Sequence, residues 1–277
     1  MRINNNTAAA NASRNVNNTH AEINKNVERL STGYRINKAG DDAAGLVISN
    51  RLRAQVSGLR QAIRNAQDGV SVLQVAEGAL SEVSTMLNRM RDLAVQSANI
   101  STNDAAARAA SQAEVNALLA EITRIGTTTK FGDVALFDGG FAPPNDGLLF
   151  QVGASQNESI EIDIPALTTV LLGIDGVDLT GNAAAINTAI GDIDDAIAMV
   201  SSTRGSFGAF QNRFESLIAN LSVTTENLAA SESRIRDTDM AAEMVEFTKN
   251  QVLQQAGTAM LAQASQIPQS VLALLQN

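Results

Sequence analysis

The chain has 277 residues, and 44% of them are apolar, which is enough to build a buried core. Its net charge of −9 disfavours nucleic-acid binding, because an acidic protein repels phosphates. No apolar run is long enough to span a bilayer, and only 3% of the residues are aromatic, so long paired helices are favoured over a compact, ring-filled enzyme fold.

The residues needed for common catalytic and metal sites are scarce. The chain has no cysteine, which excludes disulfides, thiolate metal sites and a cysteine nucleophile. Its single histidine, His20, excludes paired-histidine zinc sites and leaves little material for a catalytic triad. We therefore expect neither enzymatic activity nor a cofactor.

Apolar periodicity predicts two helices in the first hundred residues. A helix over about 15–30 carries one apolar stripe and ends at Gly33, a residue suited to the left-handed conformation. A second, much longer helix begins near Asp42 and runs to about Ser97. It has a coiled-coil seam, which includes Leu52, Val56, Leu59, Ile63, Val70 and Leu73. Three glycines within it, Gly58, Gly69 and Gly78, indicate close helix contacts or bends.

A third helix is predicted from Asp104 to about Ile125, and a β-rich insert follows at about 127–175. Within the insert, isoleucines at 160, 162 and 164 alternate with acidic residues, which is the pattern of a half-buried strand. Phe150 and Val152 give the partner strand, and Gly153 begins the turn between them. The insert is therefore expected to contain a β-hairpin.

The strongest repeat in the chain places an apolar residue at every seventh position from Ile186 to Ile235. This heptad pattern predicts a second long coiled-coil helix. Its expected core residues are Ile193, Val200, Phe207, Phe214, Leu221 and Leu228.

The last segment, residues 250–277, has no charged residue, and its apolar stripe requires a partner. The first helix is the natural candidate, so the two ends of the chain should pack together, and neighbouring copies should cover what a thin helix pair leaves exposed. The predicted fold is thus mainly α: a long antiparallel coiled-coil rod with a small β-hairpin region. The pattern alone fits any fibrous coiled-coil protein.

Short motifs near both ends are more specific. The sequence from Glu28 to Asn37, followed by Asp-Asp-Ala-Ala-Gly at 41–45, resembles the amino-terminal signature of bacterial flagellins. The segments Ser233–Asp239 and Leu261–Gln269 are similar to the carboxy-terminal pattern of the same family. The resemblance covers about 1–137 and 180–277.

The resemblance implies a subunit that self-assembles into the extracellular flagellar filament used for swimming. Residues 1–43 and 236–277 would form the inner tube, disordered in the monomer and folded on assembly, and 44–235 the outer helical domain. The expected self-assembly residues are the apolar stripes of the two terminal helices: Ile23, Val27, Leu30, Leu253, Ala256, Met260, Ala264, Ile267, Val271 and Leu274.

The resemblance also implies partners. The chain would leave the cell through the flagellar type III apparatus without a cleaved signal peptide, with an export chaperone on its carboxy-terminal segment, and would meet hook-associated and cap proteins. Arg89, Leu93 and Glu114 fall on positions that Toll-like receptor 5 contacts in the flagellins it detects. The same surface would pack between filament subunits, which is the role we favour. No nucleic-acid or membrane partner is expected.

Two other interpretations are open. A hook–filament junction protein shares the terminal helices, although the complete set of terminal motifs favours a filament subunit. A secreted enzyme with a coiled-coil stalk would need a catalytic carboxylate cluster in 127–180, where Glu161 and Asp163 share a strand face. Their alternation with isoleucines is ordinary for an amphipathic strand, so this interpretation is disfavoured.

Overall fold

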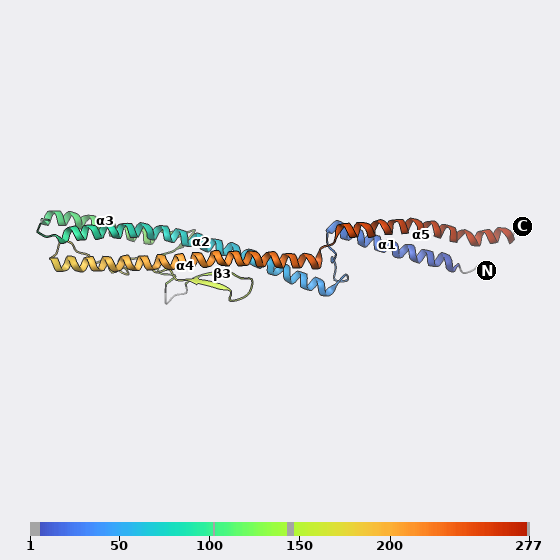
Figure 1. Cartoon of the computed structure of the whole chain (residues 1–277), viewed down its shortest axis with the longest axis horizontal. Helices are drawn as coiled ribbons and strands as arrows, with labels where there is room; N and C mark the ends of the chain where they lie inside the picture. Colours follow the sequence, from blue (N-terminus) through green and yellow to red (C-terminus); the bar gives the residue numbers. More distant parts are fainter. Residues whose placement is uncertain (1–5, 102, 143–146, 276–277) are drawn as a thin grey trace. The chain divides into compact units, whose positions relative to one another are not determined.

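The computed structural model describes residues 6–101, 103–142 and 147–275. These residues are mainly helical (Figure 1). The helices are α1 (Thr7–Thr32), α2 (Ala43–Ala98), α3 (Ala105–Thr128), α4 (Ala183–Arg236) and α5 (Met240–Leu275). Two small antiparallel sheets pair β1 (Lys130–Phe131) with β2 (Val134–Ala135), and β3 (Leu148–Gln151) with β4 (Ser159–Ile162). The predicted mainly α fold with a β-hairpin is confirmed.

The chain divides into two compact units. Unit 1 combines residues 1–56 with 226–277, and unit 2 comprises residues 57–225. The limits fall within α2 and α4, so each unit contains part of both helices.

The core of unit 2 is built from the apolar faces of α2, α3 and α4. The predicted heptad residues buried there are Leu59, Leu73, Ile193, Val200, Phe207, Phe214 and Leu221. Ile63 and Val70 are only half-buried, and Ala62, Ala66 and Val72 are buried beside them. The buried stripe of α2 drifts in this way because a straight helix has 3.6 residues per turn rather than the 3.5 of a strict heptad. In unit 1, Val56 is buried and Leu52 and Leu228 are half-buried.

Two of the three glycines in α2 mark close contacts, and one of these, at Gly69, is the predicted contact with another helix. A Cβ on Gly69 would lie 2.9 Å from the ring of Phe214 on α4. That ring meets the Phe150 ring edge to face, with 5.7 Å between centroids. A Cβ on Gly58 would lie 3.0 Å from Ala154, in the turn after β3. Gly78 has open space around it, so its place is not explained by close packing.

The β3–β4 hairpin is formed by the predicted segments and has the predicted faces. Phe150 pairs with Ile160, and Leu148 pairs with Ile162. Ile160 and Ile162 point into the core, whereas Leu149 on the opposite face is exposed. One strand face is therefore buried and the other open, which is the arrangement that the alternation predicted.

The β-structure of the insert is shorter than expected. After β4, the chain continues to α4 as an irregular segment that buries its apolar residues, namely Ile164, Leu167, Leu172, Ile174, Val177 and Leu179. The Gln112 side chain on α3 holds this segment, since it donates to the carbonyl of Val177 at 3.0 Å and accepts from the Leu179 amide at 2.6 Å. Side-chain bonds thus replace a strand ladder here.

Candidate self-assembly site

The two terminal helices, α1 and α5, pack along each other in an antiparallel pair within unit 1 (Figure 1). The Asn6 side chain near the start of α1 donates to the carbonyl of Ala264 at 2.7 Å. Further along, Val16 meets Gly257, where a Cβ would lie 2.9 Å from the Val16 methyl. The predicted pairing of the chain ends is confirmed, and glycine permits the close approach of the helices.

Both helices carry a heptad strip of less exposed residues, but the strips are rich in small and polar side chains. On α1 the strip consists of Ala9, Ala12, Val16, Thr19, Ile23, Asn26 and Leu30. On α5 it consists of Glu243, Phe247, Asn250, Gln254, Gly257, Leu261 and Ala264. Because few large apolar residues lie between the helices, this pair buries much less hydrophobic surface than the core of unit 2.

A polar side chain is buried between the two helices. Asn26 is only 4% exposed. In the amide orientation that matches its neighbours, its nitrogen donates to the Glu243 carboxylate at 2.9 Å and its oxygen accepts from the Asn250 amide at 3.1 Å. Arg29 adds an ion pair with Glu243 at 3.7 Å. A single buried, hydrogen-bonded asparagine is a known means of fixing helix register, because any slip leaves it unpaired.

Replacing Asn26 with leucine is expected to weaken assembly although it adds an apolar side chain. The change leaves Glu243 and Asn250 buried without their amide partner, at a cost of about 1–3 kcal/mol. In seeded polymerisation, the critical monomer concentration of Asn26→Leu should rise by roughly tenfold or more, since each 1.4 kcal/mol is about a factor of ten. Asn18→Leu, at an exposed position of the same helix, is the control. A critical concentration equal to that of the unmodified chain would refute the register role.

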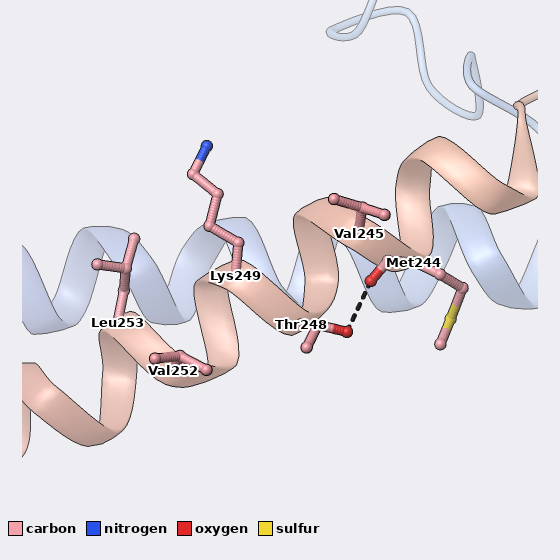
Figure 2. A pocket seen from close by; sticks show the side chains of 6 residues that line it. All are labelled: Met244, Val245, Thr248, Lys249, Val252 and Leu253. Atoms are coloured by element: carbon pink, nitrogen blue, oxygen red, sulfur yellow. Dashed lines mark hydrogen bonds between the residues drawn. The ribbon is translucent and has the colours of Figure 1, made fainter.

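The face of α5 turned away from α1 is also apolar. Figure 2 shows Met244, Val245, Thr248 and Val252 on α5, with α1 behind it in this view. Val252 is 59% exposed, and Thr248 uses its hydroxyl to bond the Met244 carbonyl at 2.8 Å. Lys249 is the only charged residue lining this surface, and an exposed apolar surface of this kind normally marks a contact with another protein.

The predicted carboxy-terminal stripe does not face α1. Leu253 and Met260 are 50% and 65% exposed, and Ala256 is exposed as well. They flank an open groove whose other wall is α1 near Val16. The strip that contacts α1 is rotated by about a quarter turn from them, given 100° per residue. Leu253, Ala256 and Met260 therefore lie at the edge of the helix pair and not between the two helices.

The remaining predicted self-assembly residues differ in how far they are buried. Ile23, Leu30 and Ala264 are half-buried in the helix pair, whereas Val27 points outward. Ile267, Val271 and Leu274 belong to α5, but their side chains lie outside the described residues.

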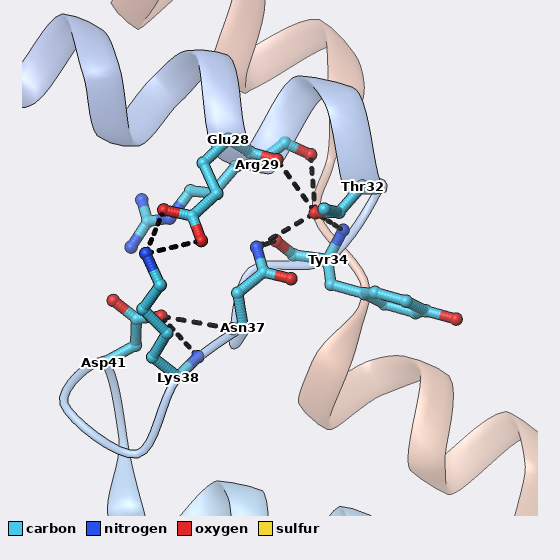
Figure 3. A network of polar contacts seen from close by, with 7 residues as sticks. All are labelled: Glu28, Arg29, Thr32, Tyr34, Asn37, Lys38 and Asp41. Atoms are coloured by element: carbon cyan, nitrogen blue, oxygen red, sulfur yellow. Dashed lines mark hydrogen bonds and ion pairs between the residues drawn. The ribbon is translucent and has the colours of Figure 1, made fainter.

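A hydrogen-bonded loop follows the end of α1. Gly33 takes the left-handed conformation, with φ of 74°, and its amide donates to the Arg29 carbonyl, as predicted for a helix end. Beyond it, Asp41 accepts from the amides of Asn37 and Lys38, and the Lys38 ammonium bonds Glu28 at 2.8 Å (Figure 3). The residues of the amino-terminal motif therefore shape the turn from α1 into α2.

The carboxyl of Asp41 is expected to titrate below its ordinary pKa of 3.8. The amide of Lys38 and then that of Asn37 stabilise the carboxylate and lower this pKa. The loop is therefore stabilised by this charge above about pH 4, and the contribution is lost as the pH falls through the lowered value. Carboxyl-carbon NMR titration of the monomer measures it directly. A pKa at or above 3.8 would show that the turn is not formed in solution.

The proposed receptor-contact residues lie together in unit 2. Arg89 on α2 and Glu114 on α3 form an exposed ion pair at 2.7 Å. This bond raises the pKa of the Arg89 guanidinium. Leu93, one turn further along α2, is only 3% exposed. A partner at this surface therefore meets the ion pair, while Leu93 supports it from within the core.

Two further observations concern the described ranges. None of the helices there combines the length and apolarity needed to cross a bilayer. No group of three or more histidine, cysteine or acidic side chains lies close enough in these ranges to hold a metal ion.

The chain resembles known proteins along its whole length. The sequence profile of the bacterial flagellin N-terminal helical region matches residues 3–142, and that of the bacterial flagellin C-terminal helical region matches residues 190–275. Flagellin of Bacillus subtilis is 45% identical, and flagellin of Halalkalibacterium halodurans 49% identical, each with both chains fully covered. A flagellar filament 33 kDa core protein of Treponema phagedenis is 44% identical over the same extent.

Among solved structures, a putative flagellar hook-associated protein from Vibrio parahaemolyticus has a similar fold. Its TM-score is 0.60 at 17% identity, and the match covers 71% of this chain and 100% of that one. At this identity the likeness concerns the fold alone.

Proposed function

Because the chain belongs to the bacterial flagellin family, we propose that its copies polymerise into the flagellar filament and that its role is structural. The filament is extracellular and serves swimming motility. Its relatives over the full length are named flagellin or flagellar filament core protein, which supports this role over that of a hook-associated protein.

The observation that carries the proposal is the uncovered apolar surface of α5. Met244, Val245 and Val252 lie on the side away from α1, and Leu253 and Met260 lie at its edge. A soluble monomer rarely keeps so continuous an apolar surface exposed, so other copies of the chain would cover it. A symmetric polymer supplies such copies without any second gene product.

The terminal helices are proposed to form the inner tube, with residues 1–43 and 236–277 as its limits and 44–235 as the outer domain. The thin, partly polar strip between α1 and α5 supports this division, because so little buried apolar area stabilises the isolated pair only weakly. On this proposal, the pair is completed and further stabilised by contacts with neighbouring subunits.

Further partners follow from the same proposal. The uncharged end of α5 would be held by an export chaperone before secretion through the flagellar type III apparatus, and hook-associated and cap proteins would contact the polymer at its ends. Monomers released from the filament would present Arg89 and Glu114 to Toll-like receptor 5, with Leu93 beneath them.

Seeded polymerisation tests the proposal. Purified full-length chain, mixed with short filament seeds, should grow long filaments in electron micrographs, whereas a chain trimmed to residues 44–235 should not. Growth of the trimmed chain would show that the terminal helices are not part of the assembly site. Rings or monomers from the full chain, under conditions in which Bacillus subtilis flagellin polymerises, would favour a junction protein instead.

A further inference from the structure

The single tyrosine of the chain, Tyr34, lies between two arginines in unit 1. The guanidinium carbon of Arg236 is 4.5 Å from the ring centroid, and that of Arg53 is 5.8 Å away. Both distances are within the range of cation–π attraction. Figure 3 shows the Tyr34 ring directed away from the Glu28–Asp41 network, so the ring belongs to a different cluster.

Backbone hydrogen bonds hold this cluster in place. The Arg35 amide donates to the Arg236 carbonyl at 2.7 Å, and the Thr238 amide donates to the Gly33 carbonyl at 3.0 Å. The Arg35 side chain adds a bond to the Ile235 carbonyl at 2.6 Å. The segment after α1 is thereby fixed against the segment that joins α4 to α5, and the positions of the arginines are set by the fold.

The positive charge of the cluster is only partly matched. Arg53 pairs with Glu232 at 3.0 Å. For Arg35, Arg234 and Arg236, no carboxylate of the described residues lies within ion-pair distance. Two guanidinium nitrogens of Arg236 are buried and have no hydrogen-bond partner. Because these two nitrogens are closed to solvent, a carboxylate from another copy would interact with the charge of the group and not with these donors.

Basic and acidic residues are nearly balanced in unit 1, whereas acidic residues are in excess in unit 2. Counted over residues 57–225, unit 2 has 9 basic and 19 acidic residues, a balance of −10. The remainder of the chain has 11 basic and 10 acidic residues, a balance of +1, and the two balances add to the net charge of −9. The excess of carboxylates on unit 2 of another copy is therefore complementary in charge to the arginine cluster.

We propose that the arginine cluster, defined as Arg53 and Arg236 beside Tyr34 together with Arg35, which bonds the Ile235 carbonyl, binds carboxylates on unit 2 of a neighbouring copy. The inference rests on the proposed filament role and assigns one of its subunit contacts. Guanidinium groups suit this task because their planar set of donors binds a carboxylate through two hydrogen bonds. Stacking on Tyr34 holds the Arg236 guanidinium in place, which reduces the entropy lost on binding.

Zero-length cross-linking tests the contact. In filaments of Arg35→Lys, carbodiimide should join the introduced amine to a carboxylate of another copy, and the unmodified chain, whose own lysines give the background, is the control. Filaments grown from mixed isotopically light and heavy chains distinguish links between copies from links within one copy by mass spectrometry. The expected product joins position 35 to a residue in 57–225 of another copy and is absent from monomers. Links only within one copy, or none above background, would overturn the proposal.

Salt dependence provides the second measurement. Arg35→Gln/Arg236→Gln should raise the critical concentration for seeded growth by about tenfold at low salt, and the difference should shrink near 1 M salt, where the screening length is about 3 Å. Arg213→Gln, an exposed arginine of unit 2, is the matched control. The fluorescence of Tyr34, free of any tryptophan signal, shows whether the cluster still folds. An unchanged critical concentration in a folded variant would contradict the proposal.

A free anion is the competing occupant. If inorganic phosphate, at constant ionic strength, changes Tyr34 fluorescence in monomers and prevents the cross-link in filaments, the cluster is an anion site and the carboxylate contact is wrong. If the unmodified chain grows normally but the cross-linking and the salt-dependence experiments are both negative, only this inference is rejected. Failure of the unmodified chain to grow from seeds rejects the proposed function together with it.

Discussion

Phe214→Ala is expected to lower the free energy of unfolding of the monomer by about 3–5 kcal/mol, the usual range for removing a fully buried aromatic ring. The ring is completely buried, contacts Phe150 edge to face, and fills the space that Gly69 leaves on α2. Three elements of unit 2 therefore lose packing together. Phe207→Ala should have a similar effect, because Phe207 is equally buried and lies one heptad before Phe214 on α4.

Urea unfolding followed by circular dichroism measures this loss. Phe131→Ala is the matched control, because Phe131 lies exposed at the β1–β2 hairpin and should change stability by less than about 1 kcal/mol. The half-buried Ile63 should give an intermediate loss when cut to alanine. Equal losses for Phe214 and Phe131 would mean that the heptad core does not hold unit 2 together.

The sequence is sufficient to predict elements whose apolar faces are buried by other parts of the same chain. The heptads from Ile186 to Leu221 and the alternation of Ile160 and Ile162 each face a core that the same chain supplies, and both predictions are confirmed. Local periodicity identifies such faces because burial selects apolar residues at fixed spacing.

Prediction from sequence was less successful for α5, where apolar residues occur on several sides. Apolar periodicity predicts that the stripe through Leu253 and Met260 packs on α1, yet the face that contacts α1 contains Asn250, Gln254 and Gly257. A rule that places the most apolar stripe against the nearest helix ignores contacts with other copies. Small and polar residues allow close approach and specific hydrogen bonds, and hydrophobic periodicity does not detect either property.

The buried polar clusters also could not be predicted from the sequence. Asn26 has no unusual neighbours along the chain, and its partners Glu243 and Asn250 are more than 200 positions away. Tyr34 and Arg236 were part of recognisable motifs, but only the fold places one over the other. Contacts of this kind depend on the three-dimensional register of distant segments.

Val252→Asp is expected to abolish filament growth while leaving the monomer folded. In one chain the side chain points away from α1 into solvent, so the new carboxylate is hydrated and costs little more than a small loss of helix propensity. If neighbouring copies cover this face in the filament, the carboxylate must be buried without a partner, at a cost of several kcal/mol for each subunit added. The critical concentration would then rise at least about a hundredfold.

Seeded growth and monomer circular dichroism, measured on the same preparations, separate assembly from folding. Val170→Asp is the matched control, because this valine is 71% exposed and belongs to unit 2, outside the terminal helices. Met260→Asp identifies which part of the surface matters, since Met260 lines the groove beside α1 and lies about a quarter turn around α5 from Val252. Growth of Val252→Asp together with a block in Met260→Asp would restrict the assembly contact to the originally predicted stripe. A block in both would mean that the assembly contact covers the outer face of α5 as well as the groove beside α1.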